Sequence, residues 1–561
     1  MPPNYPVYPV TDLRDLMLEV SRRYADRVAL KSKKEGVYQS LTYHQLRGQV
    51  IRLACAYSEL GLQKGDRVAL LAENRTEWAV AYLAAVCSGY AVVPVDKDLT
   101  HGEIVHLLRL AEPRVLVCSG DHVGRLGECR SDLPFVERII SMEQEGGRAD
   151  LTFAEALHRG REAESSGSFY EAPIRAEDLA AIIFTSGTTG NSKGVMLTHG
   201  NLISNIMATA QYVSIEEGVL LSVLPLHHMY ECMGGFLLAL YQGCTICHSE
   251  SLRRIPENLR ETGPTVVLGV PLLFETLYRR IQQGIREKGE GRFRVAMGIA
   301  ALSERVLGMN VRRLLFKSVR QKLGGRLELL ISGGAAIQGD VVRGFRELGI
   351  DFIQGYGMTE ASPIISVNRV GCSKDEAVGL PLPGVEVRVV EGEILVRSPS
   401  VMKGYYRNPE ATQEALRDGW LHTGDLGYLD EDGFLHINGR SKSVIVTPNG
   451  KNVYPEEVEG VLGASPYISE VLVWGGAESD PSEVEVQAVV VPNTETFDQK
   501  FGPDAYDEAK VQDVIGDEIR EHCKRLAPYK RVKRFTLRAE VFEKTTTRKI
   551  KRHLYTGRLQ Q

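Results

Sequence analysis

A run of small and hydroxyl-bearing side chains directly follows the apolar stretch at 179–184. The segment FTSGTTGNSKG (184–194) holds three glycines, five hydroxyls and one lysine. Glycines let backbone N–H groups approach an anion, hydroxyls donate hydrogen bonds and lysine adds a point charge. A Walker P-loop is excluded because Gly must precede the lysine and Ser or Thr must follow it. We predict phosphate contacts from Thr185, Ser186, Gly187, Thr188, Thr189, Gly190 and Lys193. A mobile surface loop is the alternative.

Two further segments carry groups that suit a nucleotide. In QGYGMTE (354–360), Tyr356 suits stacking on a base and Glu360 suits Mg²⁺, which prefers oxygen ligands. In HTGDLG (422–427), Asp425 is expected in a tight turn, where it would accept hydrogen bonds from ribose hydroxyls. Taken singly, each segment would also fit an ordinary core tyrosine or a strand-end turn.

Length and composition restrict the class of protein. A chain of 561 residues suggests two to four domains, and a net charge of -5 offers no general attraction to nucleic acid. No window approaches the roughly 18 to 20 apolar residues of a membrane span, and the first residues lack a signal-peptide pattern. The nine cysteines are sparse and irregularly spaced, as in proteins of a reducing compartment. We therefore expect a cytoplasmic location.

The order of apolar patterns predicts an α/β fold. Helical and strand patterns alternate over 41–96, and strand patterns recur at RVLVCSG, TVVLGV and LELLISGG. After about residue 370, short strands and turns indicate a β-rich subdomain. We expect an N-terminal domain at 1–439, with two α/β sheet subdomains and the β-rich subdomain, and a small α+β domain at 440–561.

In this order, the segments resemble the adenylate-forming superfamily of acyl-CoA synthetases, nonribosomal peptide adenylation domains and luciferases. The resemblance covers residues 12–552 and rests on TSGTTGNSKGVMLTH, LPLHHMYE, LLISGGAAI, QGYGMTE, GLPLPGVEVRV, GEILVRSPSVMKGYYRNPEAT, DGWLHTGDLG, GRSKSVIVTPNGKNVYPEEVE and EKTTTRKIKR. It implies that a carboxylate attacks the α-phosphate of Mg·ATP, giving acyl-AMP and pyrophosphate, and that a thiol then takes the acyl group. Residues 297–337 are most similar to long-chain fatty acid CoA ligases.

The resemblance also implies a role for individual residues. Residues 185–193 would hold the β- and γ-phosphates, and Thr185 and Glu360 would serve Mg²⁺. Asp425 would bind the ribose hydroxyls with Arg440 nearby, and Tyr356 would stack on adenine. The implied nucleotide site comprises Gly334, Ala335, Gly355, Tyr356, Gly357, Thr359, Glu360, Asp425 and Arg440.

In the C-terminal part, Lys549 aligns with the family's catalytic lysine, whose charge offsets the negative charge that builds on the phosphate. Here Glu543 and Arg548 replace the family's usual proline and glycine. A solvated basic tail is the alternative. Lys442 falls at the family's hinge, about which a mobile C-terminal domain would rotate between the two half-reactions.

Two residues are implied in thiol delivery. Gly450 matches the glycine that lets the pantetheine arm of CoA pass close to the backbone. His228 matches a position that gates the acyl and thiol tunnels, while a satisfied core histidine is the alternative. The substrates implied are a fatty acid, ATP and CoA. An acyl-AMP ligase that loads acyl carrier protein and a non-catalytic nucleotide-binding regulator are the competing functions.

Two basic stretches of the sequence indicate which anionic partners the protein could bind. Residues 524–558 hold thirteen Lys or Arg against two Glu, which suits anionic ATP and CoA without invoking nucleic acid. A helix expected at 310–326 carries six Lys or Arg. It predicts either peripheral membrane contact or a solvated basic face on a helix packed against the body. The acyl chain length, oligomeric state and pathway do not follow from the sequence.

Overall fold

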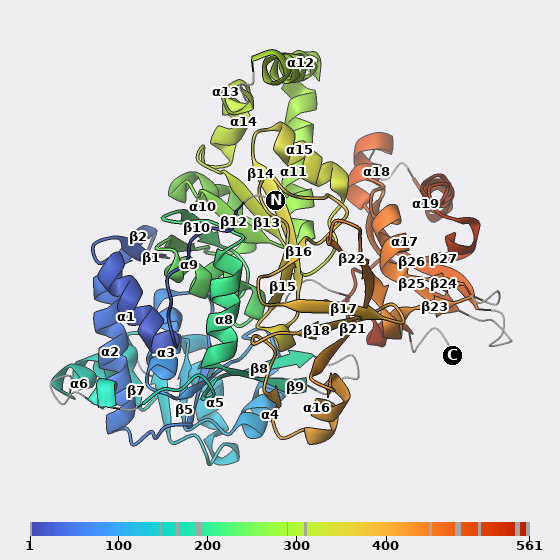
Figure 1. The fold of residues 1–561 in the computed structure, drawn as a ribbon. Helices are drawn as coiled ribbons and strands as arrows, with labels where there is room; N and C mark the ends of the chain where they lie inside the picture. Colours follow the sequence, from blue (N-terminus) through green and yellow to red (C-terminus); the bar gives the residue numbers. More distant parts are fainter. Residues whose placement is uncertain are drawn as a thin grey trace.

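A computed structural model gives the fold of the chain. It describes residues 3–145, 147–163, 168–171, 173–186, 192–288, 290–307, 311–447, 451–476, 484–502, 506–544 and 550–556. Figure 1 shows a large body of sheets and helices, an arm of helices projecting at the top, and a smaller C-terminal part at the right.

The first large sheet forms the lower part of the body in Figure 1, with strand order β19-β9-β8-β4-β3-β5-β6-β7. Its strands are β3 (Arg67–Leu71), β4 (Ala91–Pro94), β5 (Val115–Cys118), β6 (Arg138–Ser141), β7 (Leu151–Thr152), β8 (Leu179–Ser186), β9 (Ser192–Thr198) and β19 (Gly404–Tyr405). Strands β4 and β5 are buried along their whole length, as expected for short apolar runs in a parallel sheet. Helix α2 (Tyr43–Glu59) precedes the first of these strands, and the helices between them are α3 (Thr76–Cys87), α4 (His101–Ala111), α5 (Gly120–Glu128), α6 (Phe153–Ala163) and α7 (Ser168–Glu171).

The second large sheet has the order β16-β15-β14-β13-β12-β10-β11-β1-β2. Its strands are β1 (Val28–Lys34), β2 (Val37–Thr42), β10 (Val219–Ser222), β11 (Thr245–His248), β12 (Val266–Gly269), β13 (Leu329–Ser332), β14 (Asp351–Gly357), β15 (Ile364–Val367) and β16 (Leu380–Pro381). Accompanying helices are α1 (Leu13–Arg23), α8 (His199–Ala210), α9 (Leu238–Tyr241), α10 (Ile255–Thr262) and α15 (Gly339–Glu347). Parallel pairing of β10, β12, β13 and β14 brings their carboxyl ends to one edge, where such sheets bind ligands.

A third sheet confirms the β-rich part expected after residue 370. It contains β17 (Glu386–Val390), β18 (Glu393–Arg397), β20 (Leu416–Arg417), β21 (Trp420–Leu429) and β22 (Leu435–Arg440), with α16 (Pro409–Ala415) beside it. The expectation of a tight turn around Asp425 is wrong, because β21 runs through that residue. A register shift at Leu426/Gly427 bends the strand there, and Gly424 has a φ of 67°, which glycine adopts without strain.

The C-terminal part is α+β, as predicted. Its elements are β23 (Ile445–Val446), β24 (Asn452–Val453), α17 (Pro455–Leu462), β25 (Ile468–Gly476), β26 (Glu485–Pro492), α18 (Thr494–Phe501), α19 (Glu508–Cys523), β27 (Arg534–Leu537) and α20 (His553–Thr556). It has its own buried apolar cluster within 445–537. The fold class is therefore confirmed, whereas the boundary at 439/440 remains a prediction. Short 3₁₀ and π turns are η1 (Arg130–Asp132), η3 (Glu231–Leu237), η4 (Leu252–Arg254), η5 (Thr359–Ala361), η6 (Ser441–Ser443) and η7 (Pro528–Lys530).

The arm at the top of Figure 1 consists of α11 (Pro271–Lys288), α12 (Glu290–Leu307), α13 (Arg312–Leu315) and α14 (Lys317–Lys322). The single helix expected over 310–326 is instead two short helices. Phe316 separates them with a φ of -98° and a ψ of 21°, and its buried ring lies 5.2 Å from the ring of Phe293. Among the described helices, none combines the length and hydropathy needed to cross a bilayer.

A carboxyl group lies inside the main core. Glu231 is fully buried in η3, and within the described structure neither of its carboxyl oxygens has a hydrogen-bond partner. Burial raises the pKa of Glu231 to about 8, an effect that the nearby Ser222 hydroxyl and the backbone at Leu224 only partly offset. Burial also lowers the pKa of His248 to about 4. Both side chains are therefore mainly uncharged at neutral pH.

Replacing Glu231 by Gln should remove a pH dependence of stability. A carboxyl with a raised folded-state pKa favours folding below its unfolded pKa, and this contribution is lost as pH rises to the folded value. The difference in apparent Tm, Glu231→Gln minus parent, should therefore increase as the pH rises from about 5 to about 8. Exposed Glu216→Gln is the control. Parallel pH curves for parent and Glu231→Gln would show that Glu231 does not titrate in this way.

Candidate functional site

Three polar side chains meet where the second and third sheets come together. Asp425 accepts a hydrogen bond of 2.6 Å from the Tyr356 hydroxyl and pairs with Arg440 Nε at 2.9 Å. Asp425 and Arg440 are direct cross-strand partners in β21 and β22, while Tyr356 lies near the end of β14. Burial, and then Asp425, raise the pKa of Tyr356, so its hydroxyl stays protonated and donates. A 5% exposed carboxylate is thus held by partners from two sheets.

A second group is built on the β8–β9 hairpin. Thr185 pairs with Lys193 in register, and its hydroxyl donates to the Lys193 carbonyl at 3.4 Å. The Lys193 ammonium lies 4.9 Å from the centre of the Tyr405 ring, and the Tyr405 hydroxyl donates to Glu360 Oε1 at 2.9 Å. Burial, followed by Glu360, raises the pKa of Tyr405. Hairpin, β19 and η5 therefore bring Lys193 and Glu360 into one neighbourhood.

Arg440 connects the two groups electrostatically. Its charge offsets part of the rise in pKa that burial and a neighbouring carboxylate cause at Tyr356 and at Tyr405. Met402 donates its backbone N–H to the Glu360 carbonyl at 2.8 Å, which ties the segment before β19 to η5. The structure therefore gathers Thr185, Lys193, Tyr356, Glu360, Asp425 and Arg440 into one region.

Sequence reasoning missed Tyr405, although the motif GEILVRSPSVMKGYYRNPEAT contains it. The β9–β19 pairing, Tyr405 opposite Val195, joins segments 210 residues apart and sets its position beside the lysine. No local pattern in the sequence distinguishes Tyr405 from the adjacent Tyr406.

Gly334 and Ala335 lie in an exposed turn after β13. Ser332 pairs with Gln354 in the parallel β13–β14 register, so this turn lies beside the end of β14 and Tyr356. Gly334 has a φ of 85°, which favours glycine. The preceding Gly333 is required for space, because a Cβ there would lie 2.9 Å from the Tyr230 ring. Tyr230, whose hydroxyl donates to the Ile331 carbonyl at 3.0 Å, is a second residue that sequence reasoning missed.

The end of β14 is closely packed against β15. A Cβ at Gly357 would lie 2.0 Å from the Pro363 carbonyl oxygen, and one at Gly355 would lie 2.9 Å from the Ser366 carbonyl oxygen. The turn expected at 354–360 is thus a strand end followed by η5, which contains Thr359 and Glu360. The two glycines serve close strand packing here.

His228 precedes η3 and lies next to His227, with ring centres 4.8 Å apart. His227 Nε2 is 3.6 Å from Asp96 Oδ2, but burial lowers the pKa of His227 to about 4. His227 is therefore neutral at pH 7, and its contact with Asp96 is not an ion pair. The proposed hinge residue Lys442 lies in η6, next to Ser441, whose hydroxyl donates to the Gly424 carbonyl at 3.1 Å.

Some predicted site residues lie outside the described part of the chain: Gly187, Thr188, Thr189, Gly190, Gly450 and Lys549. Ser186 is placed by its backbone, which pairs with Ser192 at the end of the hairpin. On either side of 545–549, Lys544 and Ile550 form an antiparallel bridge, and Lys544 Nζ lies 2.5 Å from Glu470 Oε1.

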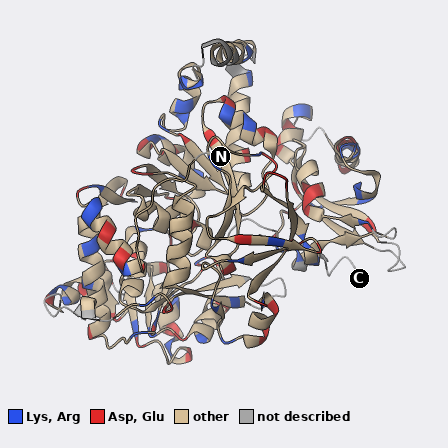
Figure 2. Cartoon of the chain, in the orientation of Figure 1, with Lys and Arg blue, Asp and Glu red and all other residues tan. Residues whose placement is uncertain are grey.

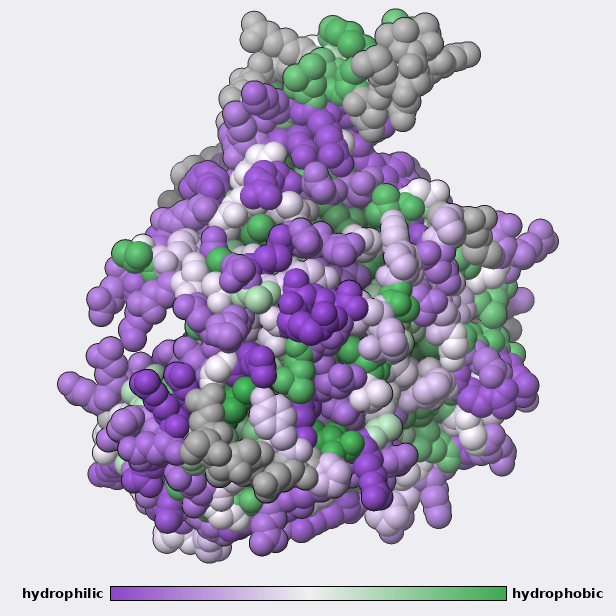
Figure 3. Space-filling model, turned by 60° about the vertical axis from the view of Figure 1, so that its left-hand side comes forward, coloured by the Kyte–Doolittle hydropathy of each residue, from purple (hydrophilic) through white to green (hydrophobic). Residues whose placement is uncertain are grey.

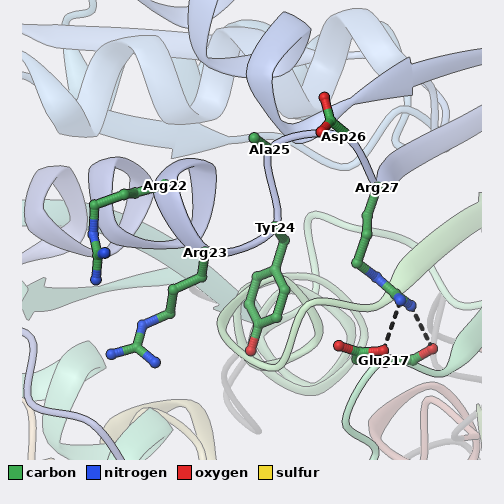
Figure 4. A pocket seen from close by; sticks show the side chains of 7 residues that line it. All are labelled: Arg22, Arg23, Tyr24, Ala25, Asp26, Arg27 and Glu217. Carbon is green, nitrogen blue, oxygen red and sulfur yellow. Dashed lines mark hydrogen bonds and ion pairs between the residues drawn. The ribbon is translucent and has the colours of Figure 1, made fainter.

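A pocket of about 480 Å³ lies elsewhere, between the end of α1 and Glu217 (Figure 4). Its arginines already have acidic partners: Arg22 and Arg23 pair with Glu19, and Arg27 Nη1 pairs with Glu217 Oε2 at 2.7 Å. Because these charges are compensated, the pocket does not compete with the polar region as the candidate site.

The comparison with protein families agrees with this geometry. The model of the family described as "AMP-binding enzyme" matches residues 18–406, which contain the hairpin, η5 and Tyr405. The chain belongs to this family. Asp425 and Arg440 lie beyond the matched residues, so their link to Tyr356 comes from the structure of this AMP-binding enzyme.

Relatives of this AMP-binding enzyme include ligases named for two different acyl acceptors, CoA and acyl carrier protein. The long-chain-fatty-acid–CoA ligase FadD15 of Mycobacterium bovis is 33% identical over 481 residues, covering 82% of this chain and 80% of the relative. The chloroplastic long-chain-fatty-acid–[acyl-carrier-protein] ligase AEE15 of Arabidopsis thaliana is 27% identical over 591 residues, covering 90% and 79%. The crystal structure of ATP-bound MatB from Rhodopseudomonas palustris matches with a TM-score of 0.76 at 27% identity, covering 98% and 99%.

A double-mutant cycle should measure the Tyr356–Asp425 link in this AMP-binding enzyme. Tyr356→Phe should lower the free energy of unfolding by about 1 kcal/mol, and Asp425→Ala by about 2 kcal/mol, because each removes a partner from a buried polar group. The double variant should lose about 1 kcal/mol less than the sum, measured by urea denaturation. Exposed Tyr428→Phe on β21 is the control. Strict additivity would mean that the hydrogen bond contributes no stability.

Proposed function

We propose that the protein activates a long-chain fatty acid with ATP, through acyl-AMP, and transfers the acyl group to CoA with release of AMP and pyrophosphate. The observation that carries this proposal is that Lys193, Glu360 and the Asp425–Arg440 pair lie in one region, where the three large sheets meet. Relatives named as long-chain-fatty-acid–CoA ligases support the choice of acid and thiol.

The Asp425 carboxylate would hold the ribose. Each of its oxygens already has one protein partner, Arg440 on Oδ1 and Tyr356 on Oδ2. An ionised carboxylate offers about four lone-pair sites, so it can still accept hydrogen bonds from ribose hydroxyls. Adenine would then lie beside Tyr356, between that ring and the turn at Gly334 and Ala335.

Lys193 would neutralise phosphate charge, and Glu360 with Thr185 would hold Mg²⁺. Carboxylate and hydroxyl oxygens are the donors that Mg²⁺ prefers, and Tyr405 donates to only one oxygen of Glu360, Oε1. Among the described residues no cluster of three or more His, Cys, Asp or Glu side chains could hold a metal. This suits Mg²⁺ bound mainly through substrate phosphates and water. When bound, the ion would neutralise charge on the transferring phosphate.

Lys549 and Lys442 would divide the two half-reactions. Lys549 would stabilise the charge that develops as the acyl carboxylate attacks the α-phosphate. Lys442, in η6 next to the Arg440 strand, would take up the backbone rotation that brings Gly450 and the thiol path into place, with His228 at the tunnel.

Variants of the two lysines should separate the half-reactions. Lys549→Ala should lower acyl-AMP formation at least about 100-fold and leave thioester formation from supplied acyl-AMP nearly unchanged, because only the first step loses a stabilising charge. Lys442→Pro should do the reverse. ATP–pyrophosphate exchange and single-turnover thioester formation measure the two steps.

Lys551→Ala is the matched control, since Lys551 belongs to the same basic segment. If Lys549→Ala and Lys551→Ala lower pyrophosphate exchange equally, Lys549 is part of a general basic tail and not a catalytic group. Equal loss of both half-reactions in Lys442→Pro would argue against a hinge at this residue.

Measuring AMP release across acids from acetate to oleate, and aryl acids, should show a maximum for long alkyl chains that depends on CoA. The AEE15 relative favours acyl carrier protein as the second candidate acceptor, so the same assay is run with that thiol. Acid-dependent pyrophosphate exchange without CoA turnover would favour carrier-protein loading. If no acid supports AMP release or pyrophosphate exchange, a non-catalytic nucleotide-binding regulator would be favoured.

We also propose a cytoplasmic location. Seven of the nine cysteines are buried, as expected for thiols that serve as core residues in a reducing compartment.

A further inference from the structure

The arm formed by α11 to α14 carries an exposed apolar stripe. Val295, Ile299 and Leu302 are spaced four and three residues apart, so they lie on one face of α12. Their side chains are 64%, 51% and 63% exposed, and Leu314 of α13 is 73% exposed. Figure 3 shows hydrophobic residues at the tip of the projecting arm. A helix face of this kind is normally packed against a partner.

The same arm is strongly basic. Residues 271–322 contain twelve Lys or Arg and four Glu, a balance of +8, whereas the whole chain has a net charge of -5. Figure 2 shows Lys and Arg along the helices of the arm. Arg313, Lys317 and Lys322 are exposed on the segment that follows α12. The positive charge is therefore concentrated beside the apolar stripe.

We propose that the arm docks on an anionic lipid bilayer, with Val295, Ile299, Leu302 and Leu314 entering the headgroup boundary and the basic side chains facing lipid phosphates. Charge complementarity favours this occupant, because apolar anchors flanked by Lys and Arg bind anionic membrane surfaces. Two arms of the same charge would repel each other, which disfavours pairing of arm with arm.

Such docking would place the candidate site close to its substrate, and in this respect the inference rests on the proposed function. Long-chain acids partition into bilayers because burying each CH₂ group is favourable. The arm begins at the candidate site: α11 follows Val270, whose Cγ1 would lie 3.8 Å from a Cβ placed at Gly334. The base of the arm therefore borders the turn at Gly334 and Ala335, which the family resemblance implies lies against the adenine and the acyl carboxylate.

The test is sedimentation of the full chain with vesicles, without ATP or acid, so that a failed activity assay cannot be mistaken for failed docking. The vesicles contain phosphatidylglycerol and phosphatidylcholine in equal parts, or phosphatidylcholine alone. The V295S/I299S/L302S variant should bind mixed vesicles about tenfold or more weakly than the parent. The R313Q/K317Q/K322Q variant should also bind more weakly, and its binding should respond less to salt.

The matched control is V37S/L252S/V390S, which changes three comparably exposed apolar residues outside the arm. It should bind mixed vesicles like the parent, and circular dichroism should be unchanged in all variants. Equal vesicle binding by the arm variants and the parent would overturn the proposal, as would equal loss in the control. The proposal would also be overturned if the parent did not bind vesicles but formed a dimer that the V295S/I299S/L302S variant does not form. A second copy of the chain would then occupy this face.

Discussion

The ion pair between Asp425 and Arg440 is the interaction on which the candidate site depends. A buried carboxylate without partners would be costly, so its position is held only while Arg440 and Tyr356 remain in contact with it. These contacts join the third sheet to the second. Arg440 is also the last residue of β22, directly before η6, so the residue that pairs with Asp425 stands where the third sheet ends and the chain continues into the C-terminal part.

Tyrosine hydroxyls make the other connections around this edge. Tyr405 links Glu360 to the hairpin that carries Lys193, and Tyr230 fixes the turn after β13 through the Ile331 carbonyl. A tyrosine can fill apolar space and still satisfy a polar partner at its tip, which suits positions where sheets meet. Glycines at 333 and 357 admit this close packing because any Cβ there would collide with a neighbour.

The distribution of charge separates two tasks within one chain. The core keeps Glu231 and His248 neutral, because ionising either would require transferring a charge into an apolar interior. The arm does the opposite, because Arg313, Lys317 and Lys322 are exposed there together with apolar side chains. The candidate site and the proposed membrane-docking surface therefore lie in different parts of the fold, which are connected through the first residues of α11.

The amino-acid sequence predicted the α/β class correctly and singled out most of the residues that the structure brings together at the candidate site, because apolar periodicity and glycine-rich motifs are local signals. It predicted the turn around Asp425 and the single helix at 310–326 wrongly, since a bulged strand and the burial of Phe316 depend on distant neighbours. The position of Tyr405 between Lys193 and Glu360, and the pairing of Arg440 with Asp425, became visible only in the folded chain. Strand pairing between segments far apart in sequence sets those contacts, and no local pattern encodes them.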